Sequence, residues 1–273
     1  MVALNLVRWD GAPSAVPFVL VHGLASNARL WDGVGAALSA LGHPVVAVDL
    51  RGHGRSPKPD SGYDVATVAS DVVPVVESLS LSLSAGGSPV VVVGQSWGGN
   101  VVLELAARWP SLPLAGVGCI DGGWLDLRSR FPSWDECARV LAPPRTVGRP
   151  YAELESFFRA RHADWPESGI QGALACFEVR EDGTVAPWFT FERHMLALRG
   201  LWEHDVGAVF PSVSVPVLLM PCEGDPGVAK REAVAAAEAG LPRSRTHWFV
   251  ADHDVHAQHP DAVASLLVEE FVR

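Results

Sequence analysis

The segment over residues 90–109 carries a serine in a setting that suits nucleophilic chemistry. Four consecutive valines, Val90–Val93, lead into the pattern Gly-x-Ser-x-Gly centred on Ser96, and a helix-compatible stretch follows at 99–109. The two glycines leave room for a strained backbone that turns sharply from a strand into a helix. We therefore expect Ser96 to stand at the tip of this turn, with its hydroxyl exposed to substrate as a nucleophile.

A serine hydroxyl is a weak nucleophile at neutral pH and needs a nearby base to take its proton. Of the ten histidines, we favour His253, which follows the last predicted strand. His256 and His259 are local alternatives. The spacing of the three histidines would also suit metal ligands, but Asp254 and Pro260 disfavour a regular helix through them, and we expect no metal.

Short apolar runs bounded by glycine, proline or aspartate predict the strands that position these residues. They lie at 17–21, 44–48, 89–93, 114–120, 215–220 and 246–250. Helix-like segments occupy 28–41, 65–80, 99–109, 228–239 and 260–272. Continuous apolar runs that alternate with helices predict a mostly parallel central sheet with helices on both faces, which is an α/β fold.

The alternation of strands and helices stops between two of the predicted strands. Residues 122–210 contain helix-like segments at 151–161 and 191–202, separated by prolines, and no strand of the same kind. A structureless loop of this length is improbable in a compact domain. We therefore predict a core domain formed by 1–121 and 211–273, with a helical lid (cap) insertion at 122–210.

Composition limits the partners and the cellular setting. The chain has 21 basic and 31 acidic residues, and its net charge of −10 disfavours nucleic acid and an anionic membrane surface as partners. No apolar run approaches the roughly 18–20 residues of a membrane span, and the first residues lack the features of a signal peptide. The four cysteines lie far apart and indicate neither a disulfide framework nor a zinc site. We expect a cytoplasmic protein.

Three further segments resemble the α/β-hydrolase superfamily, and with the serine turn the resemblance covers nearly the whole chain. His22-Gly23-Leu24 is similar to the family's oxyanion loop, and residues 49–56 are similar to the loop after the next strand. Residues 252–260 resemble the segment that holds the family's catalytic histidine, which supports His253. The resemblance implies a helical lid inserted after the sixth strand and the chain order serine, acid, histidine.

In this family a carboxylate orients the histidine ring, and two aspartates of this chain fit that role. Asp225 follows the strand at 215–220, where most members carry the acid, although Gly-Asp-Pro-Gly is also an ordinary turn sequence. Asp121 ends the strand at 114–120, a position that some members use instead. The choice stays open, with a slight preference for Asp121.

Acyl transfer also requires hydrogen-bond donors aimed at the developing oxyanion. By resemblance, these are the backbone N–H groups of Leu24 and of Trp97, which directly follows the nucleophile at a helix N-terminus. We expect His22 to support the loop rather than to react.

Together these features predict a serine hydrolase that cleaves a carboxylic ester, lactone or thioester of a small molecule through an acyl-enzyme. Five tryptophans of the insertion favour an apolar substrate; they are Trp124, Trp134, Trp165, Trp188 and Trp202. A carbon–carbon bond hydrolase, a haloperoxidase-like perhydrolase, an acyltransferase or cyclase, and a non-enzymatic ligand-binding protein remain open. No phosphate-binding loop or dinucleotide fingerprint is present, and we expect no cofactor. The oligomeric state is left open.

Overall fold

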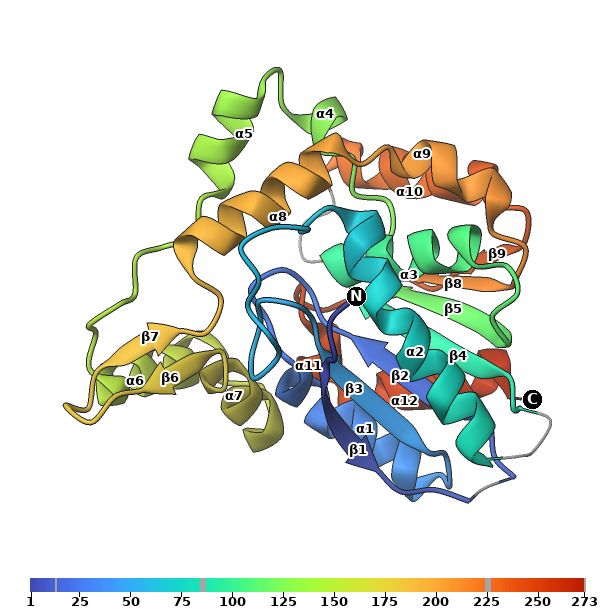
Figure 1. Ribbon diagram of the computed structural model, residues 1–273, viewed down its shortest axis with the longest axis horizontal. Helices are drawn as coiled ribbons and strands as arrows, with labels where there is room; N and C mark the ends of the chain where they lie inside the picture. The colour runs from blue at the N-terminus through green and yellow to red at the C-terminus, as the bar shows by residue number, and fades with distance from the viewer. Residues whose placement is uncertain (13, 84–86, 224–226, 273) are drawn as a thin grey trace.

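A computed structural model describes residues 1–12, 14–83, 87–223 and 227–272. Within these residues a seven-stranded sheet forms the centre of the molecule, in the order β1-β3-β2-β4-β5-β8-β9 (Figure 1). The strands are β1 (Asn5–Trp9), β2 (Phe18–Val21), β3 (Val45–Asp49), β4 (Val90–Gln95), β5 (Leu114–Ile120), β8 (Val217–Met220) and β9 (Ser244–Thr246). Only β1 pairs antiparallel, and all other neighbouring strands run parallel.

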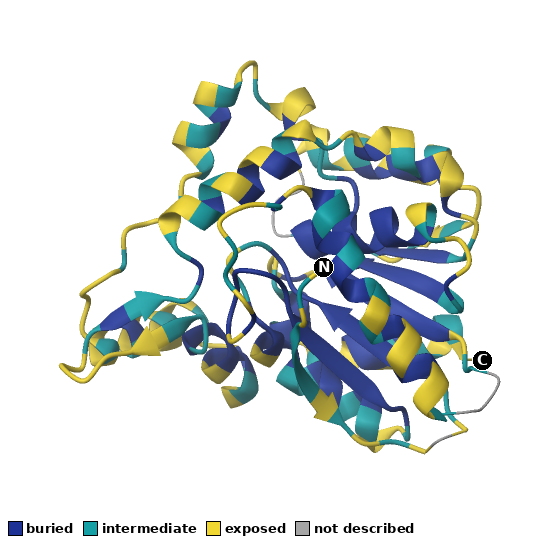
Figure 2. Ribbon diagram, in the orientation of Figure 1, coloured by how far each residue is buried: buried dark blue, intermediate teal, exposed yellow. Residues whose placement is uncertain are grey.

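The parallel strands are the apolar runs that the sequence predicted. Val19 of β2 pairs with Val46 on one side and Val92 on the other, and every residue of these three strands is buried (Figure 2). Burial on both faces explains why these runs are continuously apolar rather than alternating. The prediction of a mostly parallel α/β sheet is thereby confirmed.

Two strands differ from the prediction, and both lie at edges of the sheet. The antiparallel strand β1 was not predicted, because an edge strand is only partly buried and its sequence lacks a continuous apolar run. The last strand is shorter and earlier than the predicted 246–250. Beyond it, Phe249 forms an isolated parallel bridge with Cys222.

Helices cover both faces of the sheet, as predicted. One face packs against α1 and α12 through Val34, Leu38, Val263 and Leu267, and the other packs against α2, α3 and α10. The core helices are η1 (Ala28–Trp31), α1 (Asp32–Ala40), α2 (Val65–Leu83), α3 (Trp97–Arg108), α10 (Val228–Gly240), α11 (Val255–Gln258) and α12 (Pro260–Phe271).

Helix α2 differs from the expectation that no segment could span a membrane. Its 19 residues have a mean hydropathy of 1.3 over the most apolar window, which would suit a bilayer by length and composition alone. Half of that window is buried inside the molecule, where α2 packs on α3, and the helix carries the buried Asp71. We therefore interpret α2 as a core helix.

The long insertion lies between β5 and β8, at the carboxyl ends of the parallel strands (Figure 1). Its elements are α4 (Leu127–Arg130), α5 (Trp134–Leu141), α6 (Tyr151–Arg161), α7 (Glu167–Leu174), β6 (Phe177–Val179), β7 (Val185–Pro187), α8 (Phe191–Glu203), α9 (Val206–Val209) and η2 (Phe210–Ser212). It follows the fifth strand in chain order, not the sixth. The antiparallel hairpin β6–β7 was not predicted, because its strands have only three residues each and most of these are exposed or half-buried.

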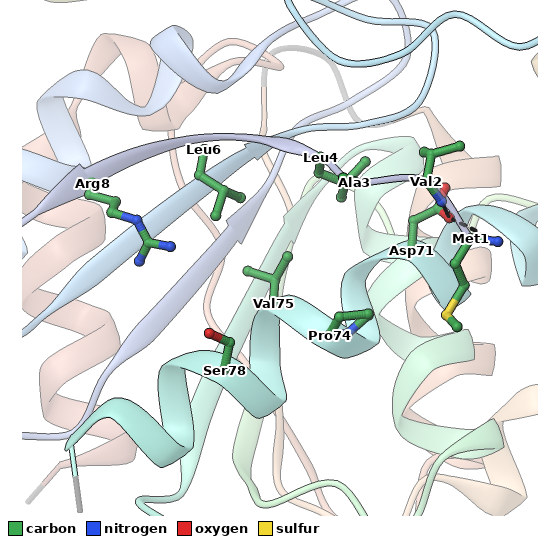
Figure 3. Close-up of a pocket in the computed structure, with 10 residues that line it drawn as sticks. All are labelled: Met1, Val2, Ala3, Leu4, Leu6, Arg8, Asp71, Pro74, Val75 and Ser78. Atoms are coloured by element: carbon green, nitrogen blue, oxygen red, sulfur yellow. Dashed lines mark hydrogen bonds and ion pairs between the residues drawn. The ribbon is translucent and has the colours of Figure 1, made fainter.

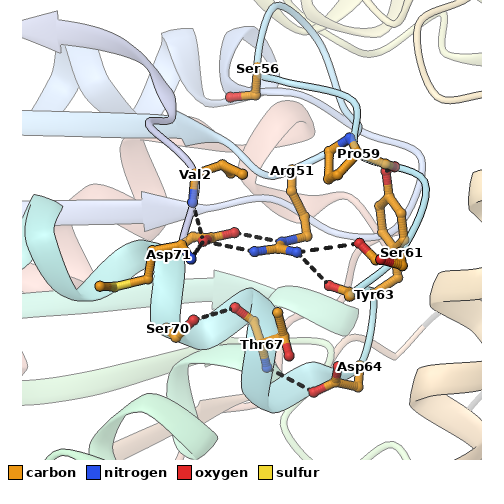
Figure 4. A network of polar contacts seen from close by, with 12 residues as sticks. Val2, Arg51, Ser56, Pro59, Ser61, Tyr63, Asp64, Thr67, Ser70 and Asp71 are labelled. Carbon is orange, nitrogen blue, oxygen red and sulfur yellow. Dashed lines mark hydrogen bonds and ion pairs between the residues drawn. The ribbon is translucent and has the colours of Figure 1, made fainter.

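A buried ion pair joins the loop after β3 to α2. Arg51 donates from Nε and Nη2 to the two carboxylate oxygens of Asp71, at 2.6 and 2.8 Å, and the side chains are 5% and 0% exposed (Figure 4). The Val2 amide donates to the same carboxylate, and Gly62 O accepts from Nη1 of Arg51. Each charge therefore has its partners inside the protein.

Asp71→Ala should lower the free energy of unfolding by about 3–5 kcal/mol, because it leaves the buried Arg51 charge without its counterion. Urea unfolding at pH 7 measures this change. Arg139→Met is the matched control, because its pair with Glu136 spans 3.9 Å between exposed side chains and should contribute less than about 1 kcal/mol. Equal losses in the two variants would contradict the interpretation.

A groove of about 410 Å³ lies between β1 and α2 (Figure 3). It is lined by Met1, Val2, Ala3, Leu4, Leu6, Arg8, Asp71, Pro74, Val75 and Ser78. None of these is a residue that the sequence predicted for the site, so the groove is separate from the chemistry considered below.

Candidate active site

Ser96 occupies a strained turn between β4 and α3. Its backbone angles are φ 53° and ψ −120°, a conformation that costs a non-glycine residue roughly 1–3 kcal/mol. Its amide donates to Ile120 O at 2.8 Å, which ties the turn to the neighbouring strand β5. The predicted strand and helix around this serine are both present, and the turn between them places Ser96 at the carboxyl edge of the sheet.

The glycines on either side of Ser96 are required by close backbone contacts. A Cβ atom at Gly94 would lie 2.1 Å from Gly98 O, and one at Gly98 would lie 2.5 Å from Val21 O. Neither position has space for a side chain. The spacing of the motif thus follows from the packing of the turn against its own helix and against β2.

Two further loops approach Ser96 from the neighbouring strands. A Cβ atom at Gly23, directly after β2, would lie 3.1 Å from Ser96 Cβ, and one at Gly122, just after β5, would lie 2.0 Å from Ser96 O. Because β2 and β5 flank β4 in the sheet, the loops that follow their carboxyl ends lie on either side of the serine. The oxyanion-loop segment and the Asp121 turn are therefore in contact with the turn at Ser96.

The structure brings His253 to Asp121. His253 Nδ1 lies 2.6 Å from Asp121 Oδ2, although the two residues are 132 positions apart in the chain. The carboxylate is 3% exposed, whereas the ring is 52% exposed. Gln95 Nε2 donates to His253 O at 3.3 Å, so the residue before Ser96 holds the histidine loop against the nucleophile strand.

The other sequence candidates lie elsewhere. Asp225 is outside the described residues. His256 is fully buried, its ring centroid lies 4.4 Å from that of Trp31, and neither ring nitrogen has a hydrogen-bond partner among the described residues. His259 is exposed at the start of α12. In the described parts of the chain, no three histidine, cysteine or acidic side chains are grouped as metal ligands would be.

Lys230 of α10 is a site residue that the sequence analysis did not identify. Its Nζ lies 2.7 Å from Asp121 Oδ1 and 3.0 Å from Oδ2. The Cys222 amide also donates to Oδ1, at 3.0 Å. In the sequence, Lys230 stands out only as one of two lysines in the chain. That rarity does not indicate which residues Lys230 contacts in the folded protein.

The contacts around Asp121 and His253 shift both pKa values. Burial alone would raise the pKa of Asp121, but the interactions with His253, Lys230 and the Cys222 amide hold it below its usual value of 3.8. Desolvation on the protein side of the His253 ring lowers its pKa. The hydrogen bond to Asp121 and the negative charges of Asp254 and Asp121 outweigh this, so the pKa lies above 6.5. An ionised Asp121 carboxylate can only accept hydrogen bonds, so Nδ1 of His253 must carry a proton. In the neutral ring Nε2 is then free to act as a base.

The kcat/KM for a neutral ester should therefore fall as pH decreases through a pKa above 6.5, because a protonated His253 cannot accept a proton. A pH profile with a non-ionising substrate measures this limb. Asp254→Asn is the comparison variant, since removal of a nearby negative charge should move the limb to lower pH. A limb below 6.5 in the unmodified protein would contradict the assignment.

Two amides near Ser96 fit the predicted oxyanion donors. Leu24 follows Gly23, and Trp97 is the first residue of α3, where the helix leaves its amides without internal acceptors. Within the part of the chain that the structure describes, neither amide donates to a protein acceptor.

Two buried histidines fix the loop that carries Leu24. His22 Nε2 accepts from the Leu50 amide at 3.0 Å, and His53 Nε2 accepts from the Ala25 amide at 3.1 Å. In both rings Nδ1 lies within 2.9 Å of a backbone carbonyl, so Nδ1 carries the proton. Burial lowers the pKa of each ring, so both stay neutral. This agrees with the expected supporting role of His22.

Both ends of the insertion are attached to the helix that follows Ser96. Asn100 Oδ1 accepts from the Gly123 amide at 3.1 Å, and Asn100 Nδ2 donates to Leu125 O at 2.9 Å. At the other end, His204 Nε2 lies 3.2 Å from Glu104 Oε2. Helix α3 therefore positions the nucleophile turn and the insertion together.

The five tryptophans of the insertion mostly pack within the protein. Trp124 and Trp165 are buried, and the rings of Trp134 and Trp202 lie 6.2 Å apart. Trp188 lies beneath Nζ of Lys58, at 5.1 Å. Packing within the protein is therefore sufficient to explain these tryptophans. Their presence alone does not indicate an apolar substrate.

The profile of the Alpha/beta hydrolase family matches residues 18–266. The chain belongs to this family. A 2-(acetamidomethylene)succinate hydrolase of Mesorhizobium japonicum is 25% identical over 269 residues, which are 95% of this chain and 88% of that protein. The solved structure of an E-2-(acetamidomethylene)succinate hydrolase is 24% identical, with a TM-score of 0.76 over 98% of this chain and 94% of the other, and shows the same fold.

Other curated relatives of this chain are more similar locally but match only a segment of it. An esterase of Mycobacterium tuberculosis is 38% identical over 111 residues, which are 40% of this chain and 34% of the esterase. The chain spans only 17–36% of the length of these segment-matching relatives. The relatives include esterases and other hydrolases, which supports the hydrolase class and leaves the substrate open.

Proposed function

We propose that this hydrolase is a serine enzyme that forms an acyl-enzyme on Ser96, with His253 as the base and Asp121 as the acid that orients it. The observation that carries the proposal is the 2.6 Å contact between His253 Nδ1 and Asp121 Oδ2. The histidine loop is also bonded to Gln95, the residue before Ser96. A serine, a base and an orienting carboxylate are the parts that nucleophilic acyl transfer requires.

We assign the steps of the proposed reaction to these groups as follows. His253 Nε2 takes the Ser96 hydroxyl proton as Oγ attacks the substrate carbonyl, and Asp121 stabilises the resulting imidazolium. The amides of Leu24 and Trp97 donate to the oxyanion, and His253 then returns the proton to the leaving group. Water attacks the acyl-enzyme in the second half-reaction, with His253 again as the base.

We propose a small carboxylic ester, lactone or thioester as the substrate class. A second candidate is the amide bond of an acetamido-substituted dicarboxylate, favoured by the similarity to the 2-(acetamidomethylene)succinate hydrolase over nearly the full length of both chains. Carbon–carbon bond hydrolysis, perhydrolysis and acyl transfer would use the same three residues. A ligand-binding protein without activity would not need them.

The decisive experiment traps the acyl-enzyme. The protein is mixed with p-nitrophenyl butyrate or with 2-(acetamidomethylene)succinate, quenched in acid and mapped by mass spectrometry, and a fluorophosphonate probe is mapped in parallel. We expect an acyl group and the probe on the peptide that contains Ser96. A protein that neither labels nor turns over substrate would overturn the proposal and favour ligand binding. Product analysis with and without an added alcohol or amine separates hydrolysis from acyl transfer.

A further inference from the structure

Lys230 makes an unusually complete set of contacts beside the proposed catalytic residues. Its ammonium group has three N–H donors and three acceptors: Asp121 Oδ1 at 2.7 Å, Asp121 Oδ2 at 3.0 Å and Cys222 O at 3.0 Å. Its side chain is 31% exposed, and the carboxylate it contacts is 3% exposed. An incidental surface ion pair would not use all its donors in this way.

We propose that Lys230 is a positioning residue for the catalytic carboxylate, holding Asp121 in the orientation and charge state that His253 requires. The proposal rests on the proposed function and extends it. With Lys230 and the Cys222 amide both donating to Oδ1, the carboxylate cannot rotate without losing hydrogen bonds, so Oδ2 stays directed at His253 Nδ1. A buried carboxylate needs such compensation to remain ionised.

Lys230 also opposes the effect of Asp121 on His253. Its contact with Oδ2 places a positive charge on the same oxygen that accepts from His253, which makes the ring a weaker base than it would be beside an unpaired aspartate. Among the described residues, the charged or titratable groups that face His253 and its carboxylate are Asp121 after β5, Asp254 in its own loop, Lys230 on α10 and His256 on α11. Beyond Asp254 lie Asp252 and His162. Among these, Lys230 is the cation bonded to the orienting acid.

The test compares pH profiles of Lys230→Met, Lys230→Arg and Arg231→Met. Arg231 is the matched control, because it lies on the same helix and pairs with Glu223 at 3.0 Å. For Lys230→Met we expect the acid limb of kcat/KM to move up by about 0.5–1 pH unit and kcat/KM to fall about 10–100-fold. In Lys230→Arg the acid limb of kcat/KM should lie close to its pH in the unmodified protein. Arg231→Met should leave the pH of the limb unchanged.

Rates are divided by the fraction of protein that the fluorophosphonate labels at Ser96, so loss of folded protein does not count as loss of function. A Lys230→Met variant that labels fully and keeps the unmodified limb and rate would overturn the positioning role. The positioning role would also be overturned if Lys230→Arg had the same pH profile and rate as Lys230→Met while its circular dichroism spectrum and labelling were normal. Failure of the unmodified protein to label at Ser96 would instead refute the proposed function.

Discussion

Replacement of Ser96 by alanine should lower kcat for p-nitrophenyl butyrate by roughly 10⁴–10⁶-fold, because no other group stands at the turn to form the acyl-enzyme. The oxyanion amides and the base would remain, so only a small residual rate is expected. Steady-state kinetics and fluorophosphonate labelling measure the loss. Alanine is small enough for the turn, but the variant keeps the positive φ of this position.

Ser156→Ala serves as the control for this variant, because Ser156 lies on the surface of α6 and, among the described residues, its hydroxyl donates only to Ala152 O of its own helix. It should label and turn over substrate normally. Persistent labelling of the Ser96→Ala protein at another residue would show that the nucleophile is elsewhere. A circular dichroism spectrum separates loss of the nucleophile from loss of the fold.

Asp121→Asn should lower kcat by roughly 10⁴-fold while the fold is retained. The reason lies in the donors that surround the carboxylate. Lys230 Nζ and the Cys222 amide both point at Oδ1, so the asparagine oxygen will take that position and its NH₂ group will face His253 Nδ1. His253 must then accept at Nδ1 and carry its proton on Nε2, where it cannot take the serine proton.

Asp225→Asn tests the other acid that the sequence left open, and it should change kcat less than about threefold if Asp121 has the orienting role. The two variants are measured with the same ester across pH 5–9. A large loss in Asp225→Asn with a small loss in Asp121→Asn would reverse the assignment. Imidazole proton resonances of His253 would report the change of tautomer directly in Asp121→Asn.

The sequence alone determined the parts of this protein that depend on local backbone structure. Continuous apolar runs such as Val90–Val93 predict buried parallel strands, because both faces of such strands are covered. The glycines around Ser96 predict the sharp turn, because only glycine tolerates the contact between Gly94 and Gly98. The short hairpin β6–β7 was not predicted, because strands of three residues with mostly exposed or half-buried side chains show no hydrophobic periodicity in the sequence.

Tertiary structure decided which distant side chains meet. The order β4-β5-β8 in the sheet places the turn after β5 between the Ser96 turn and the Cys222 amide, and there Asp121 contacts His253. Lys230 reaches this carboxylate from α10 across 109 positions of sequence. Neither contact has a local pattern, because a hydrogen bond between side chains depends on strand order and helix docking rather than on spacing along the chain. The sequence therefore named Ser96, His253 and two candidate acids, whereas the tertiary packing brought His253 and the unpredicted Lys230 to Asp121.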